Sequence, residues 1–184
     1  MSHTAAAPAK ASAGVSASAV DAAVSGVARR ELFGYVECSW NGRWYEPPIA
    51  PKTLAQLLQA SAHHGSAIRV KRNLLVKHFI PHQQLNPQEF GKFALDFLVM
   101  GNGYLEDVPN AFGRTARYAN SLAINTRRGR NDEYYFVEKF HDTHKFEAGS
   151  IFHLIEHDVS QELYGKPEYL AALQSLLLNE NATL

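Results

Sequence analysis

The segment from residue 86 to residue 103 constrains the fold of this chain most, because both ends of one helix are marked in it. Asn86-Pro87-Gln88-Glu89 offers an N-cap, a proline at the first helical position and a carboxylate at the third. Gly101-Asn102-Gly103 is typical of a left-handed helix end. Between them one apolar stripe recurs at i, i+3, i+4, i+7 and i+8: Phe90, Phe93, Ala94, Phe97 and Leu98.

The helical period is lost from Tyr104 onward, where short segments rich in aromatic and branched residues predict a mostly antiparallel strand region. Turns are expected at Asn110–Gly113 and Glu147–Ser150. A helix is expected to open at Pro167. The fold class predicted from this order is α+β. The expected strands are Tyr104–Val108, Ser121–Thr126, Tyr134–Lys139 and Ile151–Glu156.

Two further helices are expected before residue 86. The first opens at Pro51 or Thr53 and is broken by His63-His64-Gly65. The second has Ser66 as its N-cap and ends near Pro81. Its apolar set is Ile68, Val70, Leu74, Leu75 and Phe79.

An aromatic stretch precedes these helices. Asn41-Gly42, placed between Trp40 and Trp44, predicts a type I′ turn. Pro47 and Pro48 then predict an extended exit from the turn. These aromatics suit either an ordinary core or an interface with another molecule.

Composition divides the chain into three expected parts. Residues 1–30 form an Ala/Ser-rich tract with too little apolar area to offset its ordering entropy, so a disordered arm is expected there. Residues 31–165 form the expected α+β domain, and residues 166–184 form the start of a long helix. The chain stops at Leu184 inside a helical pattern without a stop signal, which predicts the front part of a longer protein.

Bulk properties exclude several classes of protein. Lys+Arg and Asp+Glu both total 18, so a globally basic nucleic-acid binder is not indicated. Cys38 is the single cysteine, which excludes an internal disulfide framework and a cysteine-rich zinc site. No apolar run approaches the length of a membrane span, and no membrane partner is expected.

The ionisable residues offer one candidate for catalysis. His153, Glu156, His157 and Asp158 could form the acid–base cluster of a small hydrolase or nuclease. No partner nucleophile is visible, and a polar strand end beside a loop is the preferred interpretation. P-loop and nucleophile-elbow motifs are both missing from the sequence. We therefore expect no enzyme activity, and no catalytic, metal or cofactor-binding site.

Two groups of basic residues could contact DNA phosphates, because Lys and Arg bind the backbone without reading sequence. One group lies on the second expected helix and the other in a loop. A solvated face, or ion pairs with a neighbouring subunit, is the preferred interpretation. The candidates are Arg69, Lys71, Arg72, Arg127, Arg128 and Arg130.

Several motifs, in chain order, carry a resemblance to a known family. Over about residues 31–184 the chain resembles the portal proteins of tailed bacteriophages, in the subgroup of temperate contractile-tailed phages and related prophages. The arm at 1–30 takes no part. The motifs are Trp44–Ile49, His63–Ile68, Val70–Asn73, Phe93–Phe97, Gly101–Glu106, Gly149–Leu154, Gln161–Tyr169, Leu173–Ser175 and Asn179–Leu184.

The resemblance implies a structural subunit of a dodecameric ring at one capsid vertex. Such rings are the conduit for double-stranded DNA during packaging and ejection. They dock the terminase and later the head-completion and tail proteins, and they contact capsid and scaffold proteins. The implied location is the virion, after assembly in the host cytoplasm. This chain would supply mainly the wing part, and its last helix would lead toward the stem and clip.

Overall fold

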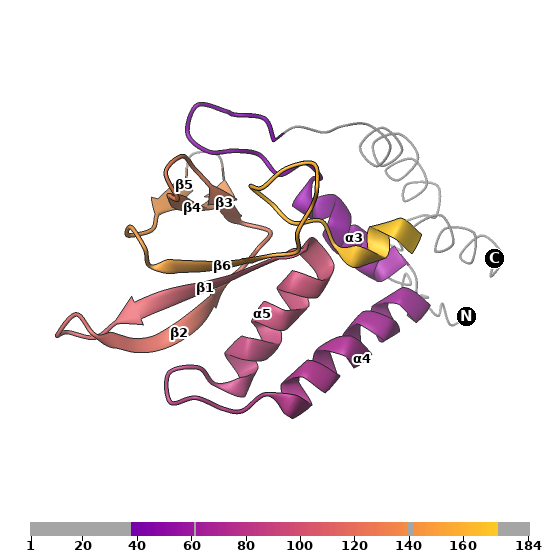
Figure 1. Ribbon diagram of the computed structural model, residues 1–184, viewed down its shortest axis with the longest axis horizontal. Helices are drawn as coiled ribbons and strands as arrows, with labels where there is room; N and C mark the ends of the chain where they lie inside the picture. The colour runs from indigo at the N-terminus through magenta and orange to yellow at the C-terminus, as the bar shows by residue number, and fades with distance from the viewer. Residues whose placement is uncertain (1–37, 61, 140–141, 173–184) are drawn as a thin grey trace, which may run out of the picture.

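The computed structural model describes residues 38–60, 62–139 and 142–172, as three helices followed by two antiparallel sheets (Figure 1). The α+β class predicted from the sequence is confirmed. The expected arm at 1–30 and residues 173–184 of the expected last helix lie outside the described residues. Within them, Glu168–Ala172 form a 3-10 helix, η2, directly after Pro167.

Helix α5 (Pro87–Met100) begins and ends where the sequence predicts. The Asn86 Oδ1 accepts a hydrogen bond from the Glu89 backbone N–H at 2.9 Å, and Pro87 occupies the first helical position. Gly101 ends the helix in the left-handed region, at φ 69, and its N–H donates to the Phe97 carbonyl.

The predicted break at His63-His64-Gly65 is wrong. Helix α3 (Pro51–Ala60) is followed at once by α4 (Ala62–His78), which runs through all three residues. Gly65 is buried, and a Cβ there would lie 2.9 Å from the carbonyl oxygen of Leu58 in α3. The glycine therefore permits close helix packing and does not end a helix. Ser66 lies inside α4, so its predicted capping role is also wrong.

The first sheet has the order β2-β1-β6, with β1 antiparallel to both neighbours. Strand β1 spans Asn102–Pro109, β2 spans Thr115–Ser121 and β6 spans Ile151–Ile155. The register places Tyr104 of β1 between Ser121 of β2 and His153 of β6. The strands predicted near Tyr104 and Ile151 are confirmed.

The second sheet has the order β3-β4-β5, with strands Thr126–Arg128, Tyr134–Lys139 and Asp142–Lys145. β4 has the predicted bounds. The strand predicted at Ser121–Thr126 is wrong, because Ser121 ends β2 and Thr126 begins β3. The residues between them turn, and the N–H groups of Asn125 and Thr126 both donate to the Leu122 carbonyl.

The aromatic turn at 40–45 adds to the open edge of β3. Tyr45 pairs with Arg128, and its N–H donates to the Arg128 carbonyl at 2.8 Å. Gly42 has φ +98, but among the described non-glycine residues only Asn131 and Asp132 have positive φ. The predicted type I′ turn is therefore wrong, since it needs positive φ at Asn41 too. The Asn41 side chain instead accepts from two backbone N–H groups within the turn.

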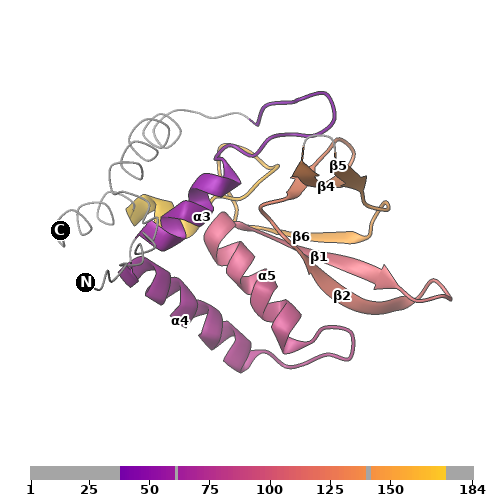
Figure 2. The ribbon, with the colours of Figure 1, turned by 180° about the vertical axis from the view of Figure 1, so that it is seen from behind.

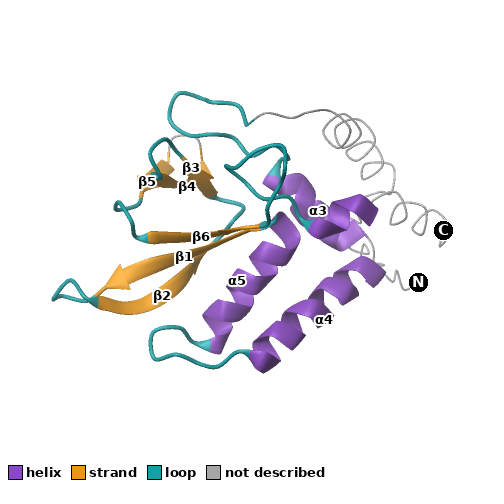
Figure 3. Cartoon of the chain, in the orientation of Figure 1, coloured by secondary structure: helices purple, strands orange, loops and turns teal. Residues whose placement is uncertain are grey.

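The helices gather on one side of the molecule and the strands on the other (Figure 3). α5 packs between α4 and the β1–β2 pair, and the same arrangement is seen from behind (Figure 2). The main core forms where the helices, the 47–51 segment and the first sheet meet. Its buried members are Ile49, Leu54, Leu57, Ile68, Val99, Met100, Tyr104 and Ala123. Among the helices of the described part, none has the length and apolarity that crossing a bilayer requires.

Candidate functional site

The three basic candidates on α4 do not share one face. Arg69 and Lys71 are two positions apart, so their side chains leave the helix about 200° apart. The Lys71 ammonium pairs with the Glu168 carboxylate at 3.0 Å on the surface. The Arg72 side chain is half-buried and lies against Gly91 of α5. α4 therefore does not present a single cationic surface.

The candidates near β3 are largely engaged inside the protein. The Arg127 side chain is 13% exposed, pairs with Glu46 at 3.3 Å and donates to two backbone carbonyls at 3.0 Å each. Arg128 binds the Asp132 carboxylate and the Glu162 carbonyl. The exposed Arg130 guanidinium lies 4.4 Å from the ring centre of Trp40. Arg127 and Arg128 thus hold the aromatic turn and the loops together.

The two basic groups are not brought together. α4 lies along the side of the molecule away from β3 and β4 (Figure 1). A DNA-backbone contact by these residues stays a prediction. Of the six, Arg69 and Arg130 expose their side chains most clearly, and Lys71 also reaches solvent.

One of the two histidines in the expected acid–base cluster, His153, points into the protein. His153 of β6 stacks on Tyr104 with ring centres 4.2 Å apart, and its Nε2 lies 3.0 Å from the Asn102 Oδ1. Burial and, to a smaller extent, the nearby positive charge of Arg128 together lower the pKa of His153 to about 3. His153 is therefore neutral over the whole physiological range.

Asn102 decides which His153 nitrogen carries the proton. The Gly165 N–H can only donate, and it donates to the Asn102 Oδ1 at 2.8 Å. The same oxygen must then accept from His153, so the Nε2 bears the proton and the Nδ1 accepts from the Tyr134 hydroxyl. The Asn102 Nδ2 donates to the carbonyls of Met100 and Gly165. These partners, which we call the Asn102 hub, use both N–H groups of the Asn102 amide and both lone pairs of its oxygen.

The other members of the expected cluster lie elsewhere. Asp158 pairs with Lys166 at 2.9 Å and accepts from Ser160, which lowers the pKa of its carboxyl against the opposing effect of burial. His157 is exposed. Among the described residues, no hydrogen bond or ion pair joins any two of His153, Glu156, His157 and Asp158. The arrangement has no acid–base pair aimed at a common point.

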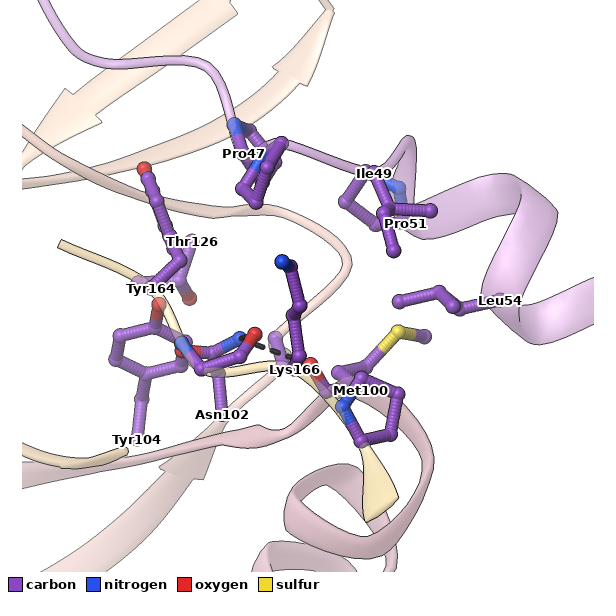
Figure 4. Close-up of a pocket in the computed structure, with 14 residues that line it drawn as sticks. Pro47, Ile49, Pro51, Leu54, Met100, Asn102, Tyr104, Thr126, Tyr164 and Lys166 are labelled. Carbon is purple, nitrogen blue, oxygen red and sulfur yellow. Dashed lines mark hydrogen bonds between the residues drawn. The ribbon is translucent and has the colours of Figure 1, made fainter. Parts of the chain in front are cut away.

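An enclosed cavity adjoins the Asn102 hub, between the 47–51 segment and the loop that holds Tyr164 (Figure 4). Its volume is ≈ 20 Å³. That is room for about one water molecule, whereas small-molecule sites measure roughly 300–1,000 Å³. The cavity therefore does not suit a substrate.

Metal-binding and nucleophilic groups are equally scarce. In the described part of the chain, no three His, Cys, Asp or Glu side chains gather as a metal site would require. The Cys38 thiol lies 3.5 Å from the Gln161 side-chain oxygen, and burial together with Asp158 raises the pKa of the thiol to about 11.

A surface feature that the sequence did not reveal is an apolar groove between α4 and α5. Its volume is ≈ 740 Å³. The sequence placed Leu74 and Leu75 in one apolar set with Ile68, Val70 and Phe79, but the two leucines are 52% and 44% exposed. The signal was present in that set itself: Val70 lies about 200° around the helix from Ile68, so the members cannot all face one core. The lining includes Leu74, Leu75, Phe79, Ile80, Phe90 and Leu98.

No protein-family model matches the chain. A probable portal protein of Escherichia phage P2 is 52% identical over 157 residues, which cover 85% of this chain and 46% of that protein. The chain is homologous to phage portal proteins. A probable portal protein of Haemophilus phage HP1 is 27% identical over 150 residues, 78% of this chain and 44% of that protein. The resemblance inferred from the motifs is confirmed, and the chain spans about half the length of these portal proteins.

Solved structures support the fold. A chain from the neck of an empty gene transfer agent (GTA) particle, computed with C6 symmetry, matches 77% of this chain and 46% of its own length, with a TM-score of 0.61. A chain from the virion of the native GTA particle matches 87% and 48%, with a TM-score of 0.58. A native neck computed with C12 symmetry matches with a TM-score of 0.57. All three are 16% identical to this chain.

Proposed function

We propose that this chain is a structural part of the subunit of a phage portal ring, the conduit for DNA entering and leaving the head. The observation that carries the proposal is the 52% identity to the phage P2 portal protein over 157 residues. The wing-like α+β part would span residues 31–165, and residues 166–184 would lead toward the stem and clip.

The geometry favours a structural role over the alternative of a hydrolase or nuclease. His153 and Asn102 use their polar atoms on each other and on neighbouring backbone. The apolar groove of α4 and α5, in contrast, lies open. A ring subunit needs faces that neighbours complete and no catalytic pocket. We therefore propose that the chain itself performs no catalysis and needs no cofactor.

The proposed partners are copies of the same subunit in a twelve-membered ring and the double-stranded DNA that passes through it. Terminase, capsid, scaffold and head-completion proteins would dock on the assembled ring. The ring would act in the virion, after assembly in the host cytoplasm.

A chimera with the phage P2 portal protein tests the ring function. The 157 aligned residues of that portal protein are replaced by those of this chain, and the purified chimera is examined by electron microscopy. Closed twelve-fold rings are expected, because the two sequences are 52% identical over the exchanged region. The same chimera with Leu57→Asp is the control: this side chain is 2% exposed, so a buried charge should prevent ring formation. A well-folded chimera that stays monomeric would contradict the proposal.

DNA contact is a separate part of the proposal, tested in the same chimera by packaged DNA per head. Neutralising Arg69, Lys71 and Arg130 to Gln should lower packaging if they touch phosphates. Neutralising Arg127 should instead lower the yield of folded protein, because it binds Glu46 and two carbonyls. Normal packaging by the triple variant would remove the first three residues as DNA contacts.

A further inference from the structure

The β1–β2 hairpin extends beyond the rest of the molecule, as both views of the ribbon show (Figures 1 and 2). β6 pairs with β1 only from Asn102 to Glu106, so from Val108 onward the two strands of the hairpin have no third described strand beside them. Their turn, at residues 110–113, therefore lies away from the core, where another molecule can reach it.

Hydrogen bonds within the turn fix its backbone. The Asn110 Oδ1 accepts from the N–H groups of Phe112 and Arg114 at 2.9 and 3.1 Å. The Asn110 N–H donates to the Arg114 carbonyl, and the Gly113 N–H donates to the Asn110 carbonyl. Gly113 supplies the positive φ that the turn needs. The side chains of Phe112 and Arg114 therefore project from an ordered turn.

The hairpin tip, residues 108–118, is cationic. It holds two arginines, Arg114 and Arg117, and no carboxylate, whereas basic and acidic residues balance over the whole chain. Both arginines are exposed, and neither makes an ion pair with a described residue. The charge of Arg117 acts on Glu89 from a distance, but that carboxylate already pairs with Lys92 at 2.6 Å. The two guanidinium groups therefore remain available to an anionic partner.

The carboxylates nearest the hairpin tip are withdrawn from its surface. The Asp107 Oδ2 accepts from the Thr115 hydroxyl at 2.8 Å, and the Asp107 Oδ1 has no contact with solvent. Glu106 is half-buried. Glu147 is exposed, but its turn meets the hairpin at Asp107, on the core side of the tip, where the Asp107 N–H donates to the Ser150 carbonyl. The surface that the tip offers to a partner is therefore positive.

The same tip displays a large aromatic side chain. Phe112 is 90% exposed and stands two positions before Arg114. Guanidinium groups bind the phosphates of DNA without reading sequence, and apolar side chains of DNA-binding proteins enter its grooves. The major groove of a duplex also admits a two-stranded β-ribbon. A phenyl ring beside unpaired arginines at the end of such a ribbon is thus suited to double-stranded DNA.

We propose that the hairpin tip binds double-stranded DNA, with Arg114 and Arg117 on backbone phosphates and Phe112 against the groove beside them. This inference deepens the proposed portal function, on which it rests for the DNA that passes through the ring. It assigns the contact to residues outside the six basic candidates of the sequence analysis, none of which lies on the hairpin.

The salt dependence of DNA binding tests the contact. The 184-residue chain is titrated into a fluorescently labelled DNA duplex at several NaCl concentrations, and the anisotropy gives the association constant. The logarithm of this constant falls with the logarithm of the salt concentration by about 0.9 for each phosphate contact, so replacing both Arg114 and Arg117 by Gln should reduce the slope by about 1.8. Phe112→Ala should weaken binding without changing the slope, because the ring carries no charge.

Lys52→Gln combined with Lys77→Gln is the matched control, because it removes the same charge from two exposed residues of α3 and α4. This pair should leave the slope as it is in the unchanged chain. Equal reductions for the two pairs would mean that DNA responds to net charge alone, and they would overturn the inference. An unchanged slope for the arginine pair, or no DNA binding by the unchanged chain, would overturn it as well.

The ring assay of the phage P2 chimera separates this inference from the portal function. Rings from the chimera, together with an unchanged slope for the arginine pair, would overturn the DNA contact and leave the portal function standing. A reduced slope without rings would support the DNA contact and contradict the portal function.

Discussion

The Asn102 hub and the groove of α4 and α5 differ in how completely the chain satisfies and covers their side chains. In the hub, each polar atom of the Asn102 side chain has a partner, and the surroundings are closed. In the groove, leucine, isoleucine and phenylalanine side chains remain in solvent. The hydrogen bonds of the hub are all made within the chain, whereas no described residue covers the groove.

This difference separates what stabilises the fold from what the fold presents to others. Removing one partner of a buried hydrogen bond lowers the free energy of unfolding, because the remaining polar group stays buried without a hydrogen bond to protein or water. Truncating an exposed apolar side chain changes the free energy of unfolding little, since the side chain contacts few neighbours. Substitutions in the hub should therefore lower the free energy of unfolding more than substitutions in the groove.

The largest effect is expected for Asn102→Ala. The substitution leaves the Gly165 N–H, the His153 Nε2–H and two carbonyls without their partner. At about 1–3 kcal/mol for each buried unsatisfied group, with partial relaxation, the free energy of unfolding should fall by about 4 kcal/mol. Denaturant titration monitored by the buried Trp44 would measure it.

Asn125→Ala is the matched control for this loss. Asn125 is half-buried, and its hydrogen bonds to Leu122 and Val137 use backbone atoms alone. The change should stay within about 0.5 kcal/mol. Similar losses for the two variants would mean that the hub contributes no more than an ordinary amide.

The second effect concerns Gly165, whose backbone lies against two other chain segments. A Cβ there would contact the Gly101 carbonyl and lie 2.6 Å from the backbone N and O of Glu156. None of these atoms can rotate away, so Gly165→Ala should cost about 3 kcal/mol. The thermal midpoint and denaturant titration both report this loss.

Gly91→Ala provides the comparison within a helix. Its Cβ would meet a side-chain methyl group of Val76 at 3.3 Å and the Arg72 guanidinium at 3.8 Å, and no backbone atom of another element. Alanine also favours the helix by up to about 1 kcal/mol, so this variant should keep or gain stability. A Gly165→Ala protein as stable as Gly91→Ala would show that the 165 segment can shift at little cost.

The third effect is the dependence of stability on pH. The pKa of His153 is lowered from 6.5 to about 3 in the folded protein, so below pH 6.5 the unfolded chain binds a proton that the folded chain does not. Stability should therefore fall as the pH falls from 6.5 toward 3, by up to about 1.4 kcal/mol per unit. Burial also lowers the pKa of His64, which adds to the same trend.

Replacing His153 by Gln should flatten this dependence, because the amide keeps a hydrogen-bond donor and does not titrate. Denaturant titrations at pH 7 and pH 5 would measure the slope. His157→Gln, at an exposed position, should leave the slope unchanged. If His153→Gln kept the original slope, His153 would not be the group that couples protons to folding.

The smallest effect is expected in the groove. Leu74→Ala should change the free energy of unfolding by less than about 0.5 kcal/mol, because half of the side chain is already in water. Leu57→Ala, at a position that is 2% exposed, should cost about 2–5 kcal/mol by contrast. A large loss for Leu74→Ala would mean that the groove belongs to the core.

Local signals explain which elements the sequence could predict. α5 has its cap, proline and terminal glycine within sixteen positions of one another, and β4 has strongly aromatic and branched residues. The strand β2, in contrast, reads Thr-Ala-Arg-Tyr-Ala-Asn-Ser and was missed. Its residues become a strand through pairing with β1, which no local pattern encodes.

The hub and the continuity of α4 needed tertiary information. Asn102 meets His153 and Gly165 across 51 and 63 positions, so no spacing rule could join them. The glycine in α4 suggested a break because its use, close approach to Leu58 of α3, depends on how two helices pack. The basic residues could be identified by type, but which of them point inward could not.

The anchoring of the aromatic turn has a consequence during synthesis. The Tyr45 carbonyl accepts its hydrogen bond from the Tyr164 hydroxyl, 119 positions later. At about 5–20 residues per second, a ribosome needs roughly 10 s to make the chain between them. For about that interval the nascent turn, with its two tryptophans, lacks this hydrogen bond, so the turn takes its final place late in synthesis.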